Sequence, residues 1–424
     1  MRIKKQQIEE HNRSQEKEHT PDFNRLADRL TAAGRDTDGL LKRLMEYQVA
    51  IPSWALGAGG TRFGRFPVGG EPGNLEEKIE DVGLLHALNR SSGAISLHIP
   101  WDIPDDPKAI QERAGELDLL FDAVNSNTFQ DQKGQEHSYK YGSLAHSDPA
   151  VRNQAVEHNI DVIRHGDALG SKALTVWLAD GSIFPGQQNF RQAFERTLDS
   201  LEKIYRELPR DWTLLIEYKP YEPNFYSMVI PDWGTSHLLA TKLGDRAKTL
   251  VDLGHHLPNT NIEQIVAILM MEQKLGGFHF NDSKYGDDDL TVGSIKPYQL
   301  FLIFSELAEG VDDPEFQPAW MIDASHNIKD PLEDLLQSVD AILTAYAKAL
   351  LIDREALNGY RESNDPVMSQ EVLQKAFQAD VRPLLREARI RSGAAADPVA
   401  LYRELQVRNQ LIRERGSDSV ATGL

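Results

Sequence analysis

The stretch Gly276–Asp289, GGFHFNDSKYGDDD, places a short apolar strand directly before a cluster of acidic residues. Phe278 and Phe280 flank His279 in a run that begins at glycines, a pattern typical of a buried β-strand. The three consecutive aspartates repel one another, and an imidazole within an apolar strand needs a polar partner. A divalent cation satisfies both needs. A solvated acidic turn beside a histidine partnered in the core does so too, and the stretch alone leaves both interpretations open.

Short β-rich runs alternate with helical segments on both sides of this stretch. The eight runs are Tyr47–Trp54, Ala94–Ile99, Leu117–Val124, Ala173–Leu178, Thr213–Tyr218, Thr249–Leu253, Gly277–Asn281 and Trp320–Ile322. The helical patterns between them include Leu75–Asn89, Asp148–Leu169, Phe190–Leu208, Ile262–Leu275 and Leu332–Tyr346. Eight β-runs, each followed by a helical segment, predict an α/β fold of the (β/α)8 TIM barrel type.

The same periodicity divides the chain into three expected parts. Residues 1–46 are polar with apolar side chains at helical spacing, which predicts an N-terminal helical segment. Residues 47–350 form the catalytic barrel. Residues 351–424 carry helical periodicity with mixed charges, and we expect a C-terminal helical tail that serves subunit assembly.

The composition excludes several classes of function. The net charge of −19 argues against a nucleic-acid partner and against a membrane surface, because phosphates and anionic lipids repel an acidic chain. No cysteine is present, so a metal must be bound through oxygen and imidazole, which favours Mg, Mn, Co or Zn. We expect a cytoplasmic protein, since we find neither an apolar run of roughly 18 residues nor a signal peptide.

Polar and aromatic side chains gather at the carboxyl ends of the predicted strands. They are His98, Trp101, Asp102, Asn125, Asn127, Trp177, Asp180, Glu217, Lys219, Asp252, His255, His256, His279, Asp323 and His326. In a barrel the carboxyl ends of the strands, with the loops that follow them, form the active site. Their coincidence with strand ends favours a metal site over scattered surface polarity.

Two groups of metal ligands can be drawn from these residues. The first comes from four successive late strands and consists of Glu217, Asp252, His279 and Asp323. The second consists of Asp252, His255, Asp287 and Asp289. In an extended loop Asp287 and Asp289 face the same way, and Asp252 then bridges two ions, as two-metal sites require. Three carboxylates with one imidazole suit Mn, Co or Zn better than Ca.

Nine segments together resemble bacterial L-rhamnose isomerase, in the branch with broad aldose specificity. They are IPSW, SLHIPWD, NSNTF, HSYKYGS, SKALTVW, EYKPYEP, VDLGHHLPNTNIE, GGFHFNDSKYGDDDL and MIDASHN. The resemblance implies a (β/α)8 barrel, a homotetramer and two divalent metal ions per subunit, with Mn preferred. It also implies that the first ligand group binds a structural ion and the second a catalytic ion.

The expected reaction is the conversion of L-rhamnose to L-rhamnulose, with other aldoses as further candidate substrates. Every carboxylate at the strand ends is committed to a cation, so a free carboxylate base is not evident. We therefore favour a metal-assisted 1,2-hydride shift over proton abstraction through an enediol. The metal ligands expected to take part in catalysis are His255, Asp287 and Asp323.

Further residues are expected to contact the sugar. Lys219 follows Glu217 by two positions and can stabilise negative charge on O1 of the sugar. His98 is the candidate for ring opening, because an imidazole can transfer a proton near neutral pH. The expected apolar walls of the substrate site are Trp101, Phe129 and Trp177. Packing in the core is the alternative role for these aromatic side chains and for His98.

Three other functions remain to be weighed. A metal-dependent phosphodiesterase on a similar barrel needs a basic groove, which this acidic chain lacks near the strand ends. A metal-dependent ketose 3-epimerase uses two glutamates as acid and base, and only Glu217 lies at a strand end. A non-catalytic sugar-binding protein conflicts with the complete set of metal ligands.

Overall fold

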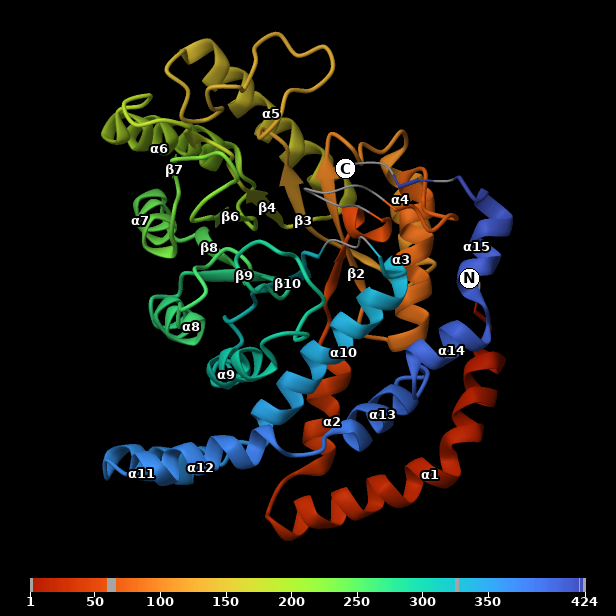
Figure 1. Ribbon diagram of the computed structural model, residues 1–424. Coiled ribbons are helices and arrows are strands. Elements are labelled where there is room, and N and C mark those ends of the chain that lie inside the picture. The colour runs from red at the N-terminus through yellow and green to blue at the C-terminus, as the bar shows by residue number, and fades with distance from the viewer. Residues whose placement is uncertain (1–2, 59–65, 325–327, 419, 422–424) are drawn as a thin grey trace.

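Eight parallel strands close into a barrel in this computed structural model, which describes residues 3–58, 66–324, 328–418, 420 and 421 (Figure 1). Around the barrel the strands follow the order β1-β10-β9-β8-β6-β4-β3-β2. Their bounds are β1 Ala50–Pro52, β2 Ala94–Ile99, β3 Leu120–Ser126, β4 Ala173–Val176, β6 Thr213–Glu217, β8 Ala247–Asp252, β9 Leu275–Phe280 and β10 Ala319–Ile322. The predicted (β/α)8 TIM barrel is confirmed.

Each barrel strand is followed by a helix that covers the outside of the barrel. These helices are α3 Leu75–Asn89, α4 Pro107–Gly115, α5 Pro149–Leu169, α6 Phe190–Glu207, α7 Trp233–Leu243, α8 Ile262–Met271, α9 Pro297–Leu307 and α10 Pro331–Leu350. Several begin at a side chain that accepts a backbone N–H of the first turn, as Asn74, Asp148 and Asp232 do. These caps fix where each loop at the barrel mouth ends.

Two strand boundaries differ from the sequence pattern for local reasons. The strand expected from Leu117 begins at Leu120, because the Leu117 N–H closes the end of α4 on Ala114 and Asp118 has a φ of +58°. The strand expected over Tyr47–Trp54 shortens to β1, because Ser53–Leu56 form a 3-10 turn, η1. This turn carries Trp54 to the barrel mouth.

Helices from the two ends of the chain pack together beside the barrel. The N-terminal pair is α1 Lys5–Ala32 and α2 Thr37–Glu46. The C-terminal helices are α11 Arg354–Glu362, α12 Pro366–Phe377, α13 Arg382–Arg391, α14 Pro398–Glu404 and α15 Val407–Arg415. Buried His11 and His19 on α1 contact Glu404 and Glu387 at 3.0 and 2.9 Å. In Figure 1, α11 and α12 project away from the barrel.

No single helix in the described ranges is long and apolar enough to cross a membrane. Helices α10 and α11 meet that test only as a pair, and they are bent by 64° at the break between them.

A two-stranded antiparallel sheet, which the sequence did not predict, joins two loops at the mouth. Its strands are β5 Gly181–Ser182 and β7 Ser227–Met228. They belong to the loops that follow β4 and β6. These loops are therefore held together above the strand ends.

Alternation along β9 separates the core from the site. Phe278 and Phe280 are fully buried, stack with ring centroids 5.3 Å apart and pack against Trp320 of β10. Phe280 also stacks on Phe304 of the covering helix α9 at 5.7 Å. Because successive side chains of a strand face opposite ways, His279 points into the barrel. Packing of β9 thereby presents the imidazole at the mouth.

Candidate metal centre

Four side chains from four neighbouring strands meet at the carboxyl end of the barrel. Glu217 and Asp252 are the last residues of β6 and β8, His279 lies in β9 next to its end, and Asp323 directly follows β10. The register sets Asp252 opposite His279. One nitrogen or oxygen donor from each residue lies within 4.8 Å of all the others. The first predicted ligand group is thus one cluster in the structure.

The His279 Nδ1 atom lies at the centre of this cluster. Its distances to the nearest oxygens of Glu217, Asp323 and Asp252 are 3.3, 3.4 and 3.6 Å. Nevertheless this nitrogen and the Asp252 Oδ2 atom are buried and make no hydrogen bond. Buried donors and acceptors are normally paired. Three carboxylates and an imidazole that converge, with one ring nitrogen and one carboxylate oxygen left unpaired, are a donor set that fits a divalent cation.

Electrostatics within the cluster lead to the same conclusion. Burial opposes a charge on His279, yet the carboxylates, Glu217 first, raise its pKa well above the usual value. Burial likewise disfavours ionised Glu217, but the positive charges of His279 and His255, with ring nitrogens 3.3 and 3.2 Å from its carboxylate, outweigh burial and lower the pKa of Glu217. In the metal-free protein, His279 therefore contributes stability that is present below about pH 6.5 and is lost as the pH rises through its folded-state pKa.

The second predicted ligand group is arranged differently. Among the described residues, only the first group brings its donor atoms within 4.8 Å of one another. His255 lies between Asp287 and Glu217, with ring nitrogens 3.1 and 3.2 Å from their oxygens. The Lys219 ammonium contacts Asp287 and so supplies positive charge beside it. Asp289 lies buried in the same loop.

The expected extended backbone of this loop is wrong. Asp287 and Asp289 have φ angles of +49° and +48°, which is the left-handed region and not an extended strand. Their side chains therefore cannot be aligned by simple alternation. Asp288 between them accepts backbone N–H groups of Lys284 and Tyr285. A turn, closed by Asp288, presents this acidic segment.

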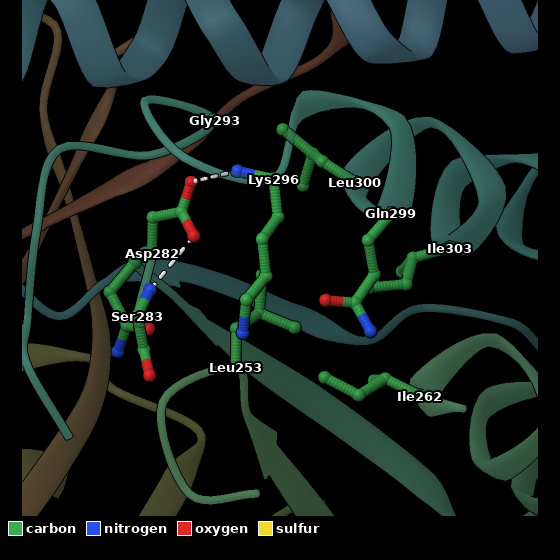
Figure 2. Close-up of a pocket in the computed structure, with 10 residues that line it drawn as sticks. Leu253, Ile262, Asp282, Ser283, Gly293, Lys296, Gln299, Leu300 and Ile303 are labelled. Atoms are coloured by element: carbon green, nitrogen blue, oxygen red, sulfur yellow. Dashed lines mark hydrogen bonds between the residues drawn. The ribbon is translucent and has the colours of Figure 1, made fainter. Parts of the chain in front are cut away.

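Asp282 holds the base of the loop, as Figure 2 shows. Its carboxylate accepts the backbone N–H groups of Ser283, Ile295 and Lys296 at 2.7–2.9 Å. The cavity beside it, lined by Leu253 among others, has a volume of about 20 Å³, room for roughly one water molecule. Asp282 thus organises the loop, and this cavity is too small for a sugar.

A larger cavity of about 500 Å³ lies among the loops that follow β3, β4 and β6. Two predicted walls, Phe129 and Trp177, line it, with ring centroids 4.9 Å apart. Sequence reasoning missed Tyr139, Glu222 and Phe225, which also line it. All three lie in loops without a strand or helix period to point them out.

Lys219 connects this cavity to the acidic loop that carries Asp287. Its ammonium lies 5.2 Å from the centre of the Trp177 ring and contacts Glu222 and Asp287. The side chain itself is buried. A fixed ammonium between an apolar wall and carboxylates can donate hydrogen bonds to a polar ligand.

His98 forms a second part of the mouth with its aromatic neighbours. The Trp101 ring lies 4.4 Å from it, and Trp54 and Phe129 stand edge-on at 5.3 and 5.6 Å. Burial lowers the pKa of His98 to about 4, so the ring is uncharged at neutral pH. Its backbone N–H donates to Asp102, at 2.8 Å. A neutral imidazole in this position can accept a proton or hydrogen bond from a hydroxyl group.

Other predicted residues take supporting positions. The His256 ring hydrogen-bonds the Tyr218 hydroxyl at 2.6 Å. Trp54, which sequence reasoning missed, donates from Nε1 to Asp323 at 2.9 Å. His326 lies outside the described residues.

Comparisons with known proteins agree on the fold and on a class of enzyme. Residues 92–311 match the family described as xylose isomerase-like TIM barrel. A probable sugar isomerase of Rhizobium meliloti is 54% identical over 398 residues, which cover 93% of each chain. One of Mesorhizobium japonicum is 50% identical over 98% of this chain and 97% of its own.

Among solved structures, an L-ribulose 3-epimerase superposes with a TM-score of 0.52. It is 17% identical, and the match covers 72% of this chain and 98% of that one. At this identity the similarity shows the shared fold only.

Binding of Mn²⁺ should release about one proton per ion from the cluster at pH 7. The reason is that the raised pKa keeps His279 protonated in the metal-free protein, whereas a metal ligand must be the neutral imidazole. Calorimetric titrations in two buffers with different heats of ionisation measure the number of protons. His279→Gln is the control and should release none from this position. Equal heats in both buffers for the unaltered protein would contradict the assignment.

Proposed function

This chain belongs to the xylose isomerase-like TIM barrel family and is a sugar isomerase, and we propose that its reaction is the metal-dependent conversion of L-rhamnose to L-rhamnulose. The observation that carries the proposal is the cluster of Glu217, Asp252, His279 and Asp323, together with an aromatic cavity whose lining residues Trp177 and Glu222 contact Lys219. The cluster supports metal-assisted chemistry, and the cavity supports a sugar whose carbon chain has an apolar end.

We propose two divalent ions per subunit, Mn²⁺ at both. The ligands of the first are Glu217, Asp252, His279 and Asp323. The ligands of the second are Asp252, His255, Asp287 and Asp289. When bound, the ions supply Lewis acidity that polarises the two sugar oxygens between which hydrogen is exchanged.

The chain's own groups orient the sugar and move its protons. Lys219 donates a hydrogen bond to O1, where negative charge develops, and its contact with Asp287 holds the ammonium in place. His98 accepts the proton of the ring hydroxyl during opening, because burial keeps its ring in the neutral form that can accept a proton. Trp101 beside it excludes water from that face.

The transfer between C2 and C1 is a direct hydride shift in this proposal. A route through an enediol needs a carboxylate base that is free to accept the C2 proton. Glu217, Asp252 and Asp323 all face the His279 imidazole, and Asp287 faces Lys219 and His255. These engagements support transfer without an intermediate base.

The preference for L-rhamnose follows from the cavity walls. L-Rhamnose is a 6-deoxy sugar, so its far end is a methyl group. Phe129, Trp177 and Phe225 offer that methyl an apolar surface, while Glu222 and Lys219 remain for hydroxyl groups. Burial of a methyl group contributes about 0.8 kcal/mol, which is enough for a preference and too little for strict exclusion of other aldoses.

Turnover should depend on added metal and on the acidic loop. We expect chelator-stripped protein to be inactive, and Mn²⁺ to restore it best among Mn²⁺, Co²⁺, Zn²⁺ and Mg²⁺. L-Rhamnose should give a higher kcat/KM than L-mannose, L-lyxose, D-ribose or D-allose. Asp287→Asn should lower kcat by about 100-fold. Asp288→Asn is the matched control and should retain turnover, because the asparagine side-chain oxygen can still accept the backbone N–H groups of Lys284 and Tyr285 that close the loop.

Epimerisation of ketoses at C3 without formation of any aldose would contradict this function and favour the 3-epimerase. Equal loss of activity in Asp287→Asn and Asp288→Asn would show that the loop fold, and not the Asp287 carboxylate, matters.

The hydride shift predicts where solvent hydrogen appears. In D₂O, the ketose formed from L-rhamnose should carry no deuterium on carbon, because the hydrogen of C2 moves to C1 without exchange. Proton NMR and mass spectrometry of the product after a single passage measure this. Deuterium at C1 would rule out the hydride shift in favour of the enediol.

We also propose that residues 1–46 and 351–424 are the assembly segments around a catalytic barrel of residues 47–350, and that four chains form a homotetramer. The projecting pair α11 and α12 supports this, since Val367 on α12 is 67% exposed although it is apolar (Figure 1). Light scattering should give four times the mass of one chain. Val367→Asp should lower that mass, and a wild-type mass of one chain would contradict assembly.

A further inference from the structure

We propose that helices α14 and α15 position the metal centre, with Arg408 and Arg415 as positioning residues for Asp323 and Trp54. This inference rests on the proposed metal-dependent function and adds to it a task for the C-terminal tail. Figure 1 shows both helices lying beside α3. Two described stretches of the barrel mouth end there: residues 66–74 of the loop from β1 to α3, and residues 328–330 of the loop from β10 to α10.

Arg408 joins the two loops directly. Its guanidinium forms a bidentate pair with Asp330, at 2.9 and 2.7 Å, and donates to the backbone oxygens of Gly69 and Gly70 at 3.1 and 3.4 Å. Asp330 ends the loop that begins at Asp323, because it caps α10. The Tyr402 hydroxyl of α14 donates to the same carboxylate at 2.9 Å. The planar guanidinium of arginine can form a bidentate pair with a carboxylate and still donate to backbone oxygens, whereas the ammonium of lysine cannot form that bidentate pair.

Arg415 anchors the other side of the first loop. It forms a bidentate pair with Asp81 of α3, at 2.7 and 2.9 Å, and donates to the Gly70 backbone oxygen at 3.2 Å. Both side chains are almost wholly buried, with 4% and 0% exposed. Removing one partner of such a pair leaves a buried charge uncompensated, so the contact is fixed in place.

Close backbone approaches show that this docking is built into the sequence. Gly69 and Gly70 have φ angles of +78° and +65°, and a Cβ on Gly70 would lie 2.5 Å from the Leu411 carbonyl carbon of α15. A Cβ on Gly57 would overlap Ala421. The Ala421 N–H also donates to the buried Glu71 carboxylate at 2.8 Å. At Gly57, Gly69 and Gly70 a Cβ would overlap the last part of the chain, so glycine is required at these three positions.

These contacts converge on the metal cluster through Trp54. Trp54 lies three residues before Gly57, and its Nε1 donates to Asp323 at 2.9 Å. Asp323 is the one cluster member beyond the end of its strand, and its side chain is 25% exposed, against 4% or less for the other three. The strand ladder fixes Glu217, Asp252 and His279. The Asp323 N–H also joins the ladder, 2.9 Å from the Phe280 oxygen, so it is the direction of the Asp323 carboxylate that depends on Trp54 and on the segments that the C-terminal helices hold.

Arg408→Gln tests the proposal against a matched control on the same tail. The control is Arg403→Gln. Arg403 of α14 forms a bidentate pair with Glu333 of α10, at 2.7 Å in each contact, so the control loses this pair but keeps the contacts with the mouth loops. Hydrogen exchange in the metal-free protein should rise about tenfold in peptides covering residues 53–58 and 319–324 in Arg408→Gln only. The dissociation constant of Mn²⁺, from electron paramagnetic resonance, should also rise about tenfold in Arg408→Gln only.

Arg408→Lys keeps the charge but not the fork and should recover part of the protection and of the Mn²⁺ affinity. If Arg408→Gln does not fold, Arg408→Lys against Arg403→Lys decides by the same two measurements. Unchanged exchange in both peptides, or an equal change in the Arg408 and Arg403 variants, would overturn the proposal. A wild-type protein that binds Mn²⁺ but turns over no sugar would contradict the proposed function alone, because neither measurement uses turnover.

Discussion

A buried excess of negative charge governs the mouth of this barrel. Three carboxylates converge on one imidazole within 4.8 Å, and the imidazole nitrogen they face makes no hydrogen bond. Carboxylates removed from water repel one another and require positive charge in return. In the metal-free protein a protonated His279 supplies one such charge. A divalent cation would supply more and would relieve the unmatched donors, so the donor set of the cluster fits a metal centre.

The parallel barrel brings these groups together without strain. Strands β6, β8, β9 and β10 are neighbours in the closed sheet, so their carboxyl ends lie side by side. Packing of Phe278 and Phe280 outward against helix α9 and Trp320 turns His279 inward. The fourth donor, Asp323, directly follows its strand, and the indole of Trp54 orients its carboxylate. In this proposal the packing of the C-terminal helices therefore affects the metal cluster through Asp323.

Sequence periodicity was sufficient where a single strand determines the direction of a side chain. The eight strands, their helices and the four residues of the cluster could all be predicted because alternation and strand ends are local features. It failed where the backbone leaves regular geometry. The left-handed turns at Asp287 and Asp289 are set by Asp288 and Asp282 through hydrogen bonds to backbone N–H groups. Contacts such as Trp54 with Asp323 join residues 269 positions apart, and no local pattern reports them.

Anomalous diffraction from a crystal of the Mn²⁺-loaded protein tests the metal centre most directly. Data collected on both sides of the manganese absorption edge locate the ion without reference to sugar turnover. The structure predicts a peak at the barrel mouth within about 2.0–2.3 Å of donor atoms from Glu217, Asp252, His279 and Asp323. A mouth without a peak, or a peak that these four side chains do not reach, would contradict the assignment of the cluster as a metal centre.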